Sequence, residues 1–162
     1  MSPGHTAPRV TDVTLRPARP DDCARVWTWR NDPDTRRASF DPTPVPFETH
    51  AAWFSASLGR PDRRLYVIIV EGRDGGTARL DVAGGEAEVS INLAPECRGR
   101  GIGPAALERL AEAAFGELGL ARLVAQVKSD NAASLAAFER AGFARVADGP
   151  AVTLARVRER RA

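Results

Sequence analysis

The glycine-rich segment at residues 98–103, Arg-Gly-Arg-Gly-Ile-Gly, has the composition of a phosphate-binding turn. An alternating run at residues 86–93 precedes it, and a helical pattern at residues 104–115 follows it. A strand that leads through such a turn into a helix directs backbone N–H groups and the positive end of the helix toward one point. Glycines also remove the Cβ atoms that would keep an anion away from the backbone. The segment therefore predicts a site for a phosphate-bearing ligand.

The spacing of these residues separates three kinds of phosphate loop. A Walker loop requires Lys and then Ser or Thr after its last glycine, and neither follows Gly103. A dinucleotide loop requires Gly-x-Gly-x-x-Gly, whereas this segment reads Gly-x-Gly-x-Gly and has no evident acidic ribose ligand downstream. The third pattern, Arg/Gln-x-x-Gly-x-Gly/Ala, is satisfied by Arg98, Gly101 and Gly103. On this motif alone, an ordinary glycine turn between a strand and a helix stays open.

The third pattern resembles the acetyl-CoA pyrophosphate loop of the GCN5-related N-acetyltransferases, the GNAT superfamily. Residues 131–143 extend the resemblance, because they follow an apolar run at residues 123–127 and end in Gly-Phe, like the superfamily's fifth strand and next helix. The resemblance covers residues 13–147 and implies direct acetyl transfer from acetyl-CoA, the co-substrate, to a primary amine. It implies acetyl-CoA contacts at the following residues: Ile91, Leu93, Arg98, Gly99, Arg100, Gly101, Ile102, Gly103, Pro104, Asn131 and Phe138.

Acetyl transfer needs a base to remove a proton from the amine. Alternation along the strand puts four polar side chains on one face: Glu86, Glu88, Ser90 and Asn92. This face indicates a wet cleft, and the resemblance implies that Glu88 is the catalytic base. The alternative is a solvated carboxylate, or one paired with an arginine such as Arg79.

Protonation of the leaving thiolate is where the sequence departs from the superfamily. Many members carry a tyrosine four residues before the Gly-Phe, and Phe138 stands there in this chain. Because phenylalanine cannot donate a proton, the remaining donors are Ser134, one turn earlier, or a water; a thiolate with a pKa near ~8.5 also needs no dedicated donor. Tyr66, the single tyrosine, lies on another strand and is expected to pack or face the substrate. Asn131 is predicted to cap the following helix.

The first half of the chain is expected to select the amine. Residues 27–33 read Trp-Thr-Trp-Arg-Asn-Asp-Pro, and residues 50–54 read His-Ala-Ala-Trp-Phe. This pairing is similar to nucleotide-linked amino-sugar N-acetyltransferases of the pseudaminic-acid type, which we favour, and to RimJ/RimL-type protein N-terminal acetyltransferases. The alternative of another class is a non-catalytic acyl-CoA-binding module. The expected substrate-binding residues are Arg30, Asn31, His50, Trp53 and Glu86.

Two of these assignments have plain alternatives. Tryptophans at helical spacing are often part of a core, and His50 could be a second base or a polar residue at the edge of its helix. A nucleotide would find both stacking groups and arginines in this segment.

The elements needed to position these residues follow the order β α α β β β α β α β β. Strands are expected at residues 11–16, 64–71, 77–82, 86–93, 123–127, 144–147 and 151–157, and helices at residues 20–31, 47–58, 104–115 and 131–141. This order gives an α/β (α+β) fold with a mixed, mostly antiparallel sheet of six or seven strands and helices on both faces. The resemblance implies the acyl-CoA N-acyltransferase fold, in which the sheet splays between the fourth and fifth strands.

Composition limits the classes of partner. The chain has 162 residues, a net charge of +2 and two cysteines without Cys-x-x-Cys spacing. We expect one domain at residues 11–158 between a flexible tail at 1–10 and a short basic tail at 159–162. We expect a cytoplasmic monomer or homodimer that binds a small amine, including a nucleotide sugar, but no metal, membrane or nucleic acid.

Overall fold

The computed structural model of the protein describes residues 12–159. The predicted tail at residues 1–10, and residues 160–162 of the predicted basic tail, lie outside the described residues. The described chain forms a seven-stranded sheet in the order β1-β2-β3-β4-β5-β7-β6, antiparallel except between β4 and β5. The strands are β1 (Val13–Pro17), β2 (Arg63–Val70), β3 (Arg73–Ala83), β4 (Glu86–Leu93), β5 (Arg122–Lys128), β6 (Ala144–Ala147) and β7 (Ala151–Val157).

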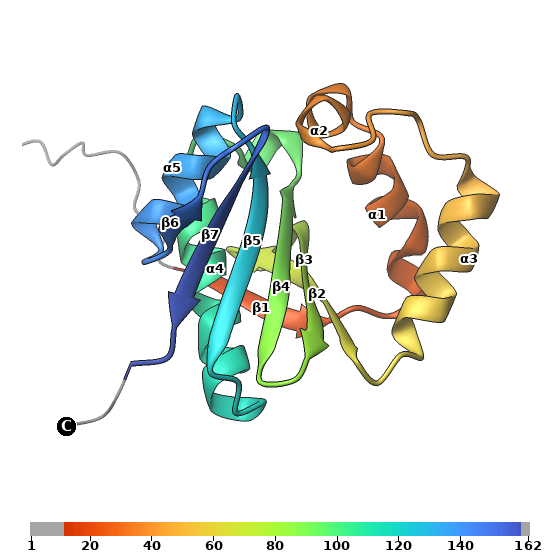
Figure 1. Ribbon diagram of the computed structural model, residues 1–162. Coiled ribbons are helices and arrows are strands. Elements are labelled where there is room, and N and C mark those ends of the chain that lie inside the picture. The colour runs from red at the N-terminus through yellow and green to blue at the C-terminus, as the bar shows by residue number, and fades with distance from the viewer. Residues whose placement is uncertain (1–11, 160–162) are drawn as a thin grey trace, which may run out of the picture.

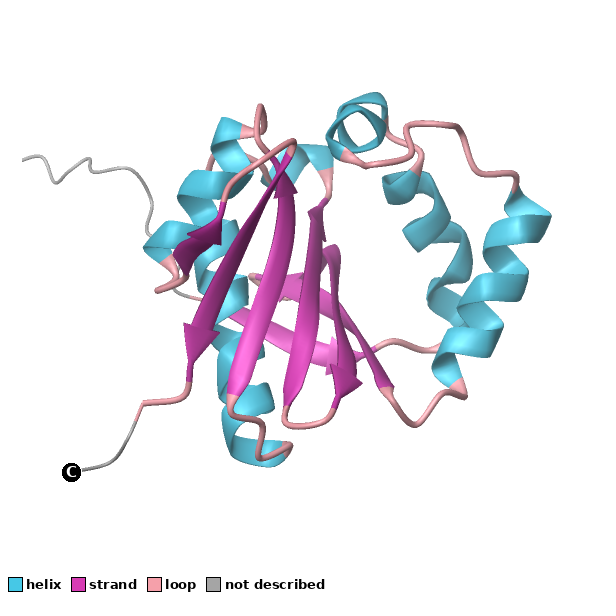
Figure 2. Cartoon of the chain, viewed as in Figure 1, coloured by secondary structure: helices cyan, strands magenta, loops and turns pink. Residues whose placement is uncertain are grey.

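Helices cover both faces of this sheet, as Figures 1 and 2 show. One side carries the first three helices, and α4 and α5 lie on the other, so the predicted α/β architecture is confirmed. No helix among residues 12–159 has the length and apolar character needed to cross a membrane. The helices are α1 (Cys23–Arg30), α2 (Pro33–Ala38), α3 (Phe47–Leu58), α4 (Ile102–Glu112), continued by a π-helical turn (Ala113–Glu117), and α5 (Ala132–Arg140).

Helix α2 begins where the sequence pattern predicts only a break between helices, at residues 31–34. Asp32 caps α2 by accepting hydrogen bonds from the N–H groups of Asp34 and Thr35, and Pro33 occupies the first helical position. Both features start a helix as readily as they end one. Six residues are too few for a hydrophobic period to show.

The apolar core lies on both faces of the sheet. The side chains of Leu107 and Leu110 from α4 are almost completely buried, as are those of Phe54 and Trp29 from α3 and α1. At least for Trp29, the alternative that helical tryptophans belong to the core is therefore confirmed. Each side of the sheet thus has its own packed layer of helices, and the position of β4 between them is fixed from both faces.

Strands β4 and β5 share a very short ladder. Its register has three pairs, which end at Glu88 and Val124. Beyond that point β4 pairs only with β3, as far as Leu93, and β5 pairs only with β7, as far as Lys128. The predicted splay of the sheet between its fourth and fifth strands begins here.

Gly76 allows β3 to approach the end of β4 closely. It lies opposite Leu93 in the register, and its backbone has a φ of +156°. A Cβ atom at this position would lie 2.4 Å from the carbonyl oxygen of Asn92. The path of β4 beside the splay therefore requires glycine at this position.

One buried polar contact joins α1 to α3. His50 of α3 has no exposed surface; its Nε2 lies 3.1 Å from the carbonyl oxygen of Cys23, and its Nδ1 lies 3.3 Å from Nη1 of Arg30. A carbonyl can only accept, so Nε2 carries the proton and Nδ1 accepts from Arg30. Burial, followed by the charge of Arg30, lowers the pKa of His50. The ring is therefore neutral in the folded protein near pH 7.

We predict that Gly76→Ala destabilises the protein, because the new Cβ must displace the end of β4. The expected loss is about 2–4 kcal/mol from crowding and backbone strain, which corresponds to a fall in Tm of roughly 4–16 °C. Calorimetry on Gly85→Ala is the matched control, since a Cβ there meets nothing within 4 Å. Equal losses in both variants would show that crowding against β4 is not the cause.

We also predict that acidification destabilises the fold through His50. An unfolded histidine binds a proton with a pKa of about 6.5, whereas folded His50 binds one only at lower pH. Below pH 6.5 the unfolded state therefore holds more protons, and the free energy of unfolding should fall by up to about 1.4 kcal/mol per pH unit. Urea unfolding between pH 7.5 and 5 measures this slope. His50→Gln should be less stable but should lose the His50 contribution to the slope; an unchanged slope would assign the acid sensitivity to other groups.

Candidate active site

The glycine turn opens α4 without a side-chain cap. Gly99 and Gly101 have φ angles of +70° and +76°, in the left-handed region that favours glycine, and Gly101 is the N-cap residue. No side chain hydrogen-bonds at this cap, and Pro104 in the first turn has no N–H to satisfy. Ile102 is completely buried and anchors the turn. The first N–H groups of α4 are thus held in place and left available to an anion.

The first turn of α4 also packs against α5. A Cβ at Gly103 would lie 3.5 Å from the Cβ of Ala137, an ordinary contact. Arg100 is exposed and pairs with Glu71 at 3.3 Å. The glycine turn therefore sits between the two helices of one face, with its charged side chain directed to the β2–β3 turn.

The side chain of Arg98 is engaged within the protein, and the acetyl-CoA contact expected of this residue stays a prediction. Its Nη2 donates to the Asp32 carboxylate at 2.9 Å, to Oγ1 of Thr35 at 2.7 Å and to the carbonyl of Leu93 at 3.3 Å. Its N–H donates to the carbonyl of Pro95 at 3.3 Å. Arg98 thus joins the end of β4 to the start of α2 and positions the glycine turn that follows.

The edge of β4 beyond the ladder carries backbone donors. The N–H of Ala94 donates to Gly75 in β3 at 2.8 Å. Since successive residues of a strand turn their N–H groups to opposite sides, those of Leu93 and Ile91 point away from β3, toward the splay. The Leu93 carbonyl, which Arg98 contacts, lies on this same edge. Both residues expected to pair with the pantetheine arm therefore direct their N–H groups into the gap between β4 and β5.

Glu88 stands at the last paired position before the strands separate. Its side chain is exposed and has no ion-pair partner among the described residues. The alternative of a pair with Arg79 is absent, because Arg79 binds Asp81 at 3.0 Å and Oγ of Ser90 at 3.2 Å. A carboxylate that is free of partners, beside the splay, is geometrically able to accept a proton from a bound amine.

Glu86 lies two residues earlier on the same face, at the closed end of the ladder. Its carboxylate pairs with Arg122 on β5 at 3.1 Å. This pair joins β4 to β5 where they are hydrogen-bonded, farther from the glycine turn than Glu88. Glu86 thus helps to close the sheet, and its expected substrate contact stays a prediction.

Helix α5 carries two of the expected acetyl-CoA residues, Asn131 at its N-cap and Phe138 in its second half. Asn131 caps it by accepting a hydrogen bond from the N–H of Ser134 at 3.2 Å. Phe138 is buried and packs edge-on against Phe143, with 5.0 Å between ring centroids. This packing gives Phe138 a structural role, and its assignment as an acetyl-CoA contact stays a prediction. Ser134 is half-buried in the first turn of α5, one turn before Phe138.

Tyr66 does not replace the missing tyrosine. It pairs with Ala78, next to Arg79 in β3, so it faces the side of the sheet opposite to Arg79 and Glu88. Burial, followed by the charge of Glu117, raises the pKa of its hydroxyl. The described residues therefore place no tyrosine hydroxyl on the face of the candidate base.

Asn31 and His50, two of the expected substrate residues, make structural contacts. Nδ2 of Asn31 donates to the carbonyl of Val45 at 2.8 Å, and Oδ1 of Asn31 accepts from the N–H of Val45 at 2.8 Å. Nε1 of Trp27 donates to the same carbonyl at 2.7 Å. They fix the loop between α2 and α3. His50 is completely buried between α1 and α3. The assignments of Asn31 and His50 as substrate contacts stay predictions that these structural contacts do not support.

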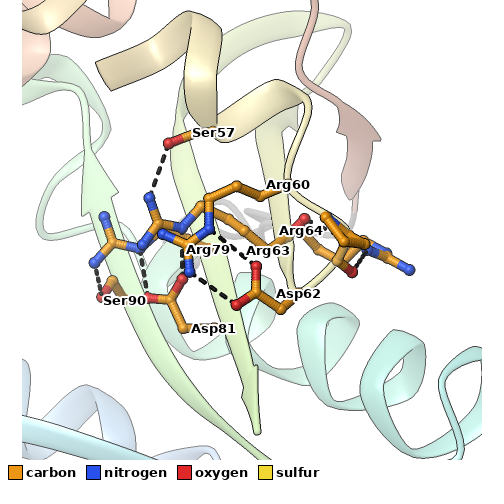
Figure 3. A network of polar contacts seen from close by, with 9 residues as sticks. Ser57, Arg60, Asp62, Arg63, Arg64, Arg79, Asp81 and Ser90 are labelled. Carbon is orange, nitrogen blue, oxygen red and sulfur yellow. Dashed lines mark hydrogen bonds and ion pairs between the residues drawn. The ribbon is translucent and has the colours of Figure 1, made fainter. Parts of the chain in front are cut away.

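Arg30 and Trp53 lie together on the face that carries Glu88. Three guanidinium groups surround the Trp53 ring: those of Arg30, Arg63 and Arg79, at 5.0, 5.5 and 5.6 Å from its centroid. Asp81 pairs with Arg63 at 2.6 Å and with Arg79 at 3.0 Å, as Figure 3 shows. We call Arg30, Trp53, Arg63, Arg79 and Asp81 the arginine–tryptophan cluster.

Arg63 and Asp81 were not singled out from the sequence. Alternation assigns each of them to a face of its own strand, but their contact depends on the register of β2 against β3, in which they stand directly opposite each other. A pair of isolated charges in two neighbouring strands was the available signal. The neighbouring residues in the sequence do not distinguish this ion pair from two solvated surface charges.

A separate hollow of about 620 Å³ lies between β1 and α1, away from Glu88. Its charged side chains satisfy one another: Arg16 pairs with Asp22 at 2.8 Å and with Asp74 at 3.4 Å, and Arg25 also pairs with Asp74. Arg16 lowers the pKa of Asp22 by its hydrogen bond. We therefore assign no ligand to this hollow. Within residues 12–159, no group of three His, Cys, Asp or Glu side chains is arranged to hold a metal.

Comparison with known structures gives several close similarities of fold. The aminoglycoside acetyltransferase AAC(6')-Ib in complex with coenzyme A and kanamycin is 22% identical with a TM-score of 0.81, over 91% of this chain and 95% of that one. The Vibrio cholerae spermidine N-acetyltransferase in complex with CoA and spermine is 19% identical with a TM-score of 0.81, over 90% and 95%. A protein assigned as a phosphinothricin N-acetyltransferase is 29% identical with a TM-score of 0.74, over 90% and 98%.

The search of curated proteins found no significant match. The family model described as the acetyltransferase (GNAT) domain matches residues 12–144, which is most of the chain. The match includes β4, the glycine turn, α4, β5 and α5, the elements that form the candidate site. The chain therefore belongs to the GNAT acetyltransferase family and is an acetyl-CoA-dependent N-acetyltransferase.

Proposed function

We propose that the chain transfers acetyl directly from acetyl-CoA to the primary amine of a small molecule, with a nucleotide-linked amino sugar as the first candidate. The observation that carries this proposal is the separation of β4 from β5 immediately after Glu88. It leaves backbone donors and a free carboxylate on one strand, within reach of one reacting centre. The finer identity of the sugar rests on the resemblance of residues 27–33 and 50–54.

In this mechanism the acetyl donor is held mainly by backbone groups. The pyrophosphate binds the N–H groups of residues 99–103 at the uncapped start of α4. The N–H groups of Ile91 and Leu93 bind the pantetheine arm and polarise the thioester carbonyl. One such donor to a developing oxyanion typically contributes about 2.7–4 kcal/mol to the transition state. The proposal assigns Asn131 and Ser134, at the start of α5, to the same site.

Glu88 acts as the base in this proposal. Its carboxylate takes a proton from the ammonium form of the acceptor, directly or through a water, and the neutral nitrogen attacks the thioester carbon. The C–S bond then breaks, the nitrogen loses its second proton to water, and the thiolate leaves. Phe138 is buried, and its phenyl side chain has no acidic proton to donate. In this proposal Ser134 or a water therefore protonates the sulfur.

The acceptor enters on the face of β4 that α1, α2 and α3 partly cover. Glu88, Ser90 and Asn92 lie on this face, and Arg30 and Trp53 extend it. Protein N-terminal acetylation would need an open groove for a peptide beside Glu88. In this chain α2 reaches across the splay instead, since Nζ of Lys128 on β5 donates to the carbonyl of Arg37 at 2.9 Å. This contact favours a small acceptor.

The experiment that tests the proposal is a turnover screen that follows CoA release. Acceptors should include UDP-linked amino sugars, free amino sugars, aminoglycosides, polyamines, amino acids and short peptides. We expect the turnover of at least one small amine to exceed the turnover of every peptide. Activity confined to peptides would support N-terminal acetylation, and tight acetyl-CoA binding without turnover of any amine would support a non-catalytic module.

We predict that Glu88→Gln lowers kcat/KM by about 10²–10⁴-fold, the usual contribution of a positioned base. The affinity for acetyl-CoA should stay within about twofold, because Glu88 is exposed and has no ion pair to lose. Steady-state kinetics and calorimetric titration measure the two effects. Full activity in Glu88→Gln, or loss of activity in Glu86→Gln alone, would move the base to another position.

We predict that Gly101→Ala weakens acetyl-CoA binding at least tenfold, because a methyl group and a strained left-handed residue then stand at the start of α4. Gly119→Ala is the matched control. Gly119 has a φ of +65° and no atom near its Cβ position, so it suffers the same strain away from the turn. Comparable losses of acetyl-CoA affinity in both variants would mean that general destabilisation, and not the loop, is responsible.

A further inference from the structure

The arginine–tryptophan cluster has more positive than negative charge. Three guanidinium groups lie within 5.6 Å of the Trp53 centroid, and one carboxylate, Asp81, pairs with two of them. Arg30 has no carboxylate within 4.0 Å among the described residues. The cluster therefore has three positive charges against one negative charge, and Arg30 is the member without a counter-ion among the described residues.

The partner that Arg30 does have is neutral. Its Nη1 lies 3.3 Å from Nδ1 of His50, which accepts because Nε2 of that ring donates to Cys23. Burial and the nearby charge of Arg79 lower the pKa of Arg30. A partly buried cation without an anion is unfavourable in a folded protein. The ring of Trp53 offsets part of this cost through its π-face, and an added anion would offset the rest.

The cluster also lies beside the candidate base. In the register of β3 against β4, Arg79 stands opposite Ser90 and Asp81 stands opposite Glu88. Ser90 is two residues from Glu88 on the same face, a separation of roughly 7 Å along a strand. One small molecule could therefore place its amine at Glu88 and a second functional group between Arg30 and Arg79.

We infer that the arginine–tryptophan cluster is an anion subsite of the acceptor, so that the preferred amine carries an oxyanion: a carboxylate, a phosphate or a phosphinate. This inference rests on the proposed function and narrows its substrate class. Arg30 and Arg79 bind the oxyanion, and Asp81 with Arg63 holds Arg79 in place. Polycationic amines are disfavoured, since they would bring further positive charge to three guanidinium groups.

The test compares amines that differ in one anionic group. The matched pairs are glucosamine 6-phosphate and glucosamine, methionine and methioninamide, and a UDP-linked amino sugar and the free sugar, with spermidine as the polycation. The phosphate, carboxylate and nucleotide arms distinguish the source of the oxyanion. In at least one pair the anionic member should have a kcat/KM about tenfold or more above that of its partner.

Arg30→Gln should lower kcat/KM for the anionic member by about 10- to 100-fold, as expected for loss of a charge-assisted hydrogen bond. The neutral member should change by no more than about threefold. Arg79→Gln should act in the same direction, and Arg30→Lys should restore part of the loss because it keeps the charge without the planar fork. Arg64→Gln is the matched control. Arg64 is next to Arg63, and among residues 12–159 its side chain donates only to the carbonyls of Pro61 and Arg63.

The outcomes separate this inference from the proposed function. Turnover that prefers neutral or polycationic amines, with no selective effect of Arg30→Gln, overturns the subsite and leaves the acetyltransferase intact. Weaker acetyl-CoA binding in Arg30→Gln, measured by calorimetry with an unchanged Tm, also overturns it by assigning the cluster to the donor.

Absence of turnover with every amine would reject the proposed function, and the subsite is then tested by binding alone. Pyrophosphate titrated into the CoA-saturated protein should quench tryptophan fluorescence in the native chain and not in Arg30→Gln. No binding of pyrophosphate to the native chain at millimolar concentration would overturn the subsite.

Discussion

Strands β4 and β5 run in parallel and share a ladder of three residue pairs, after which each strand keeps only its outer neighbour. A sheet that separates in its middle leaves two rows of backbone groups without partners, at about 1–3 kcal/mol for each buried group that stays unpaired. The sheet tolerates this because separate helical layers hold β4 from both faces. The gap persists as a place where a ligand's amide and carbonyl groups can complete the pairing. The glycine turn, the backbone donors of β4 and the carboxylate of Glu88 all take their positions from this separation.

The open end of the gap is organised by α2. Arg98 joins this helix to the end of β4 through Asp32 and Thr35, and Thr35 also donates to Oδ1 of Asn92 at 3.0 Å. On the other side, Lys128 reaches the carbonyl of Arg37. A six-residue helix thus contacts both strands that border the gap.

Local patterns predicted most of the fold and the strand–turn–helix frame of the candidate site. Glycine spacing at residues 98–103 and alternation at residues 86–93 depend on neighbours in the chain, so the turn and the exposed face of β4 were predictable. The contacts of Asn31, with the backbone of Val45, depend on tertiary packing that no local pattern encodes. Phe138 is different again, because its departure from tyrosine was visible but its packing against Phe143 was not.

The distribution of charge gives the two substrates different modes of recognition. In the glycine turn, the charge of Arg98 is paired with that of Asp32, and the charge of Arg100 with that of Glu71. The pyrophosphate is therefore left to the backbone and the dipole of α4, a neutral arrangement that need not release an ion pair before it binds. Beside Glu88 the arginines are not fully neutralised, because Asp81 pairs with two of them and the partner of Arg30 is a neutral histidine. An ammonium group near Glu88 and an anion near Arg30 would each meet the opposite charge, so the field across this face orients a zwitterionic acceptor with its nitrogen toward the thioester.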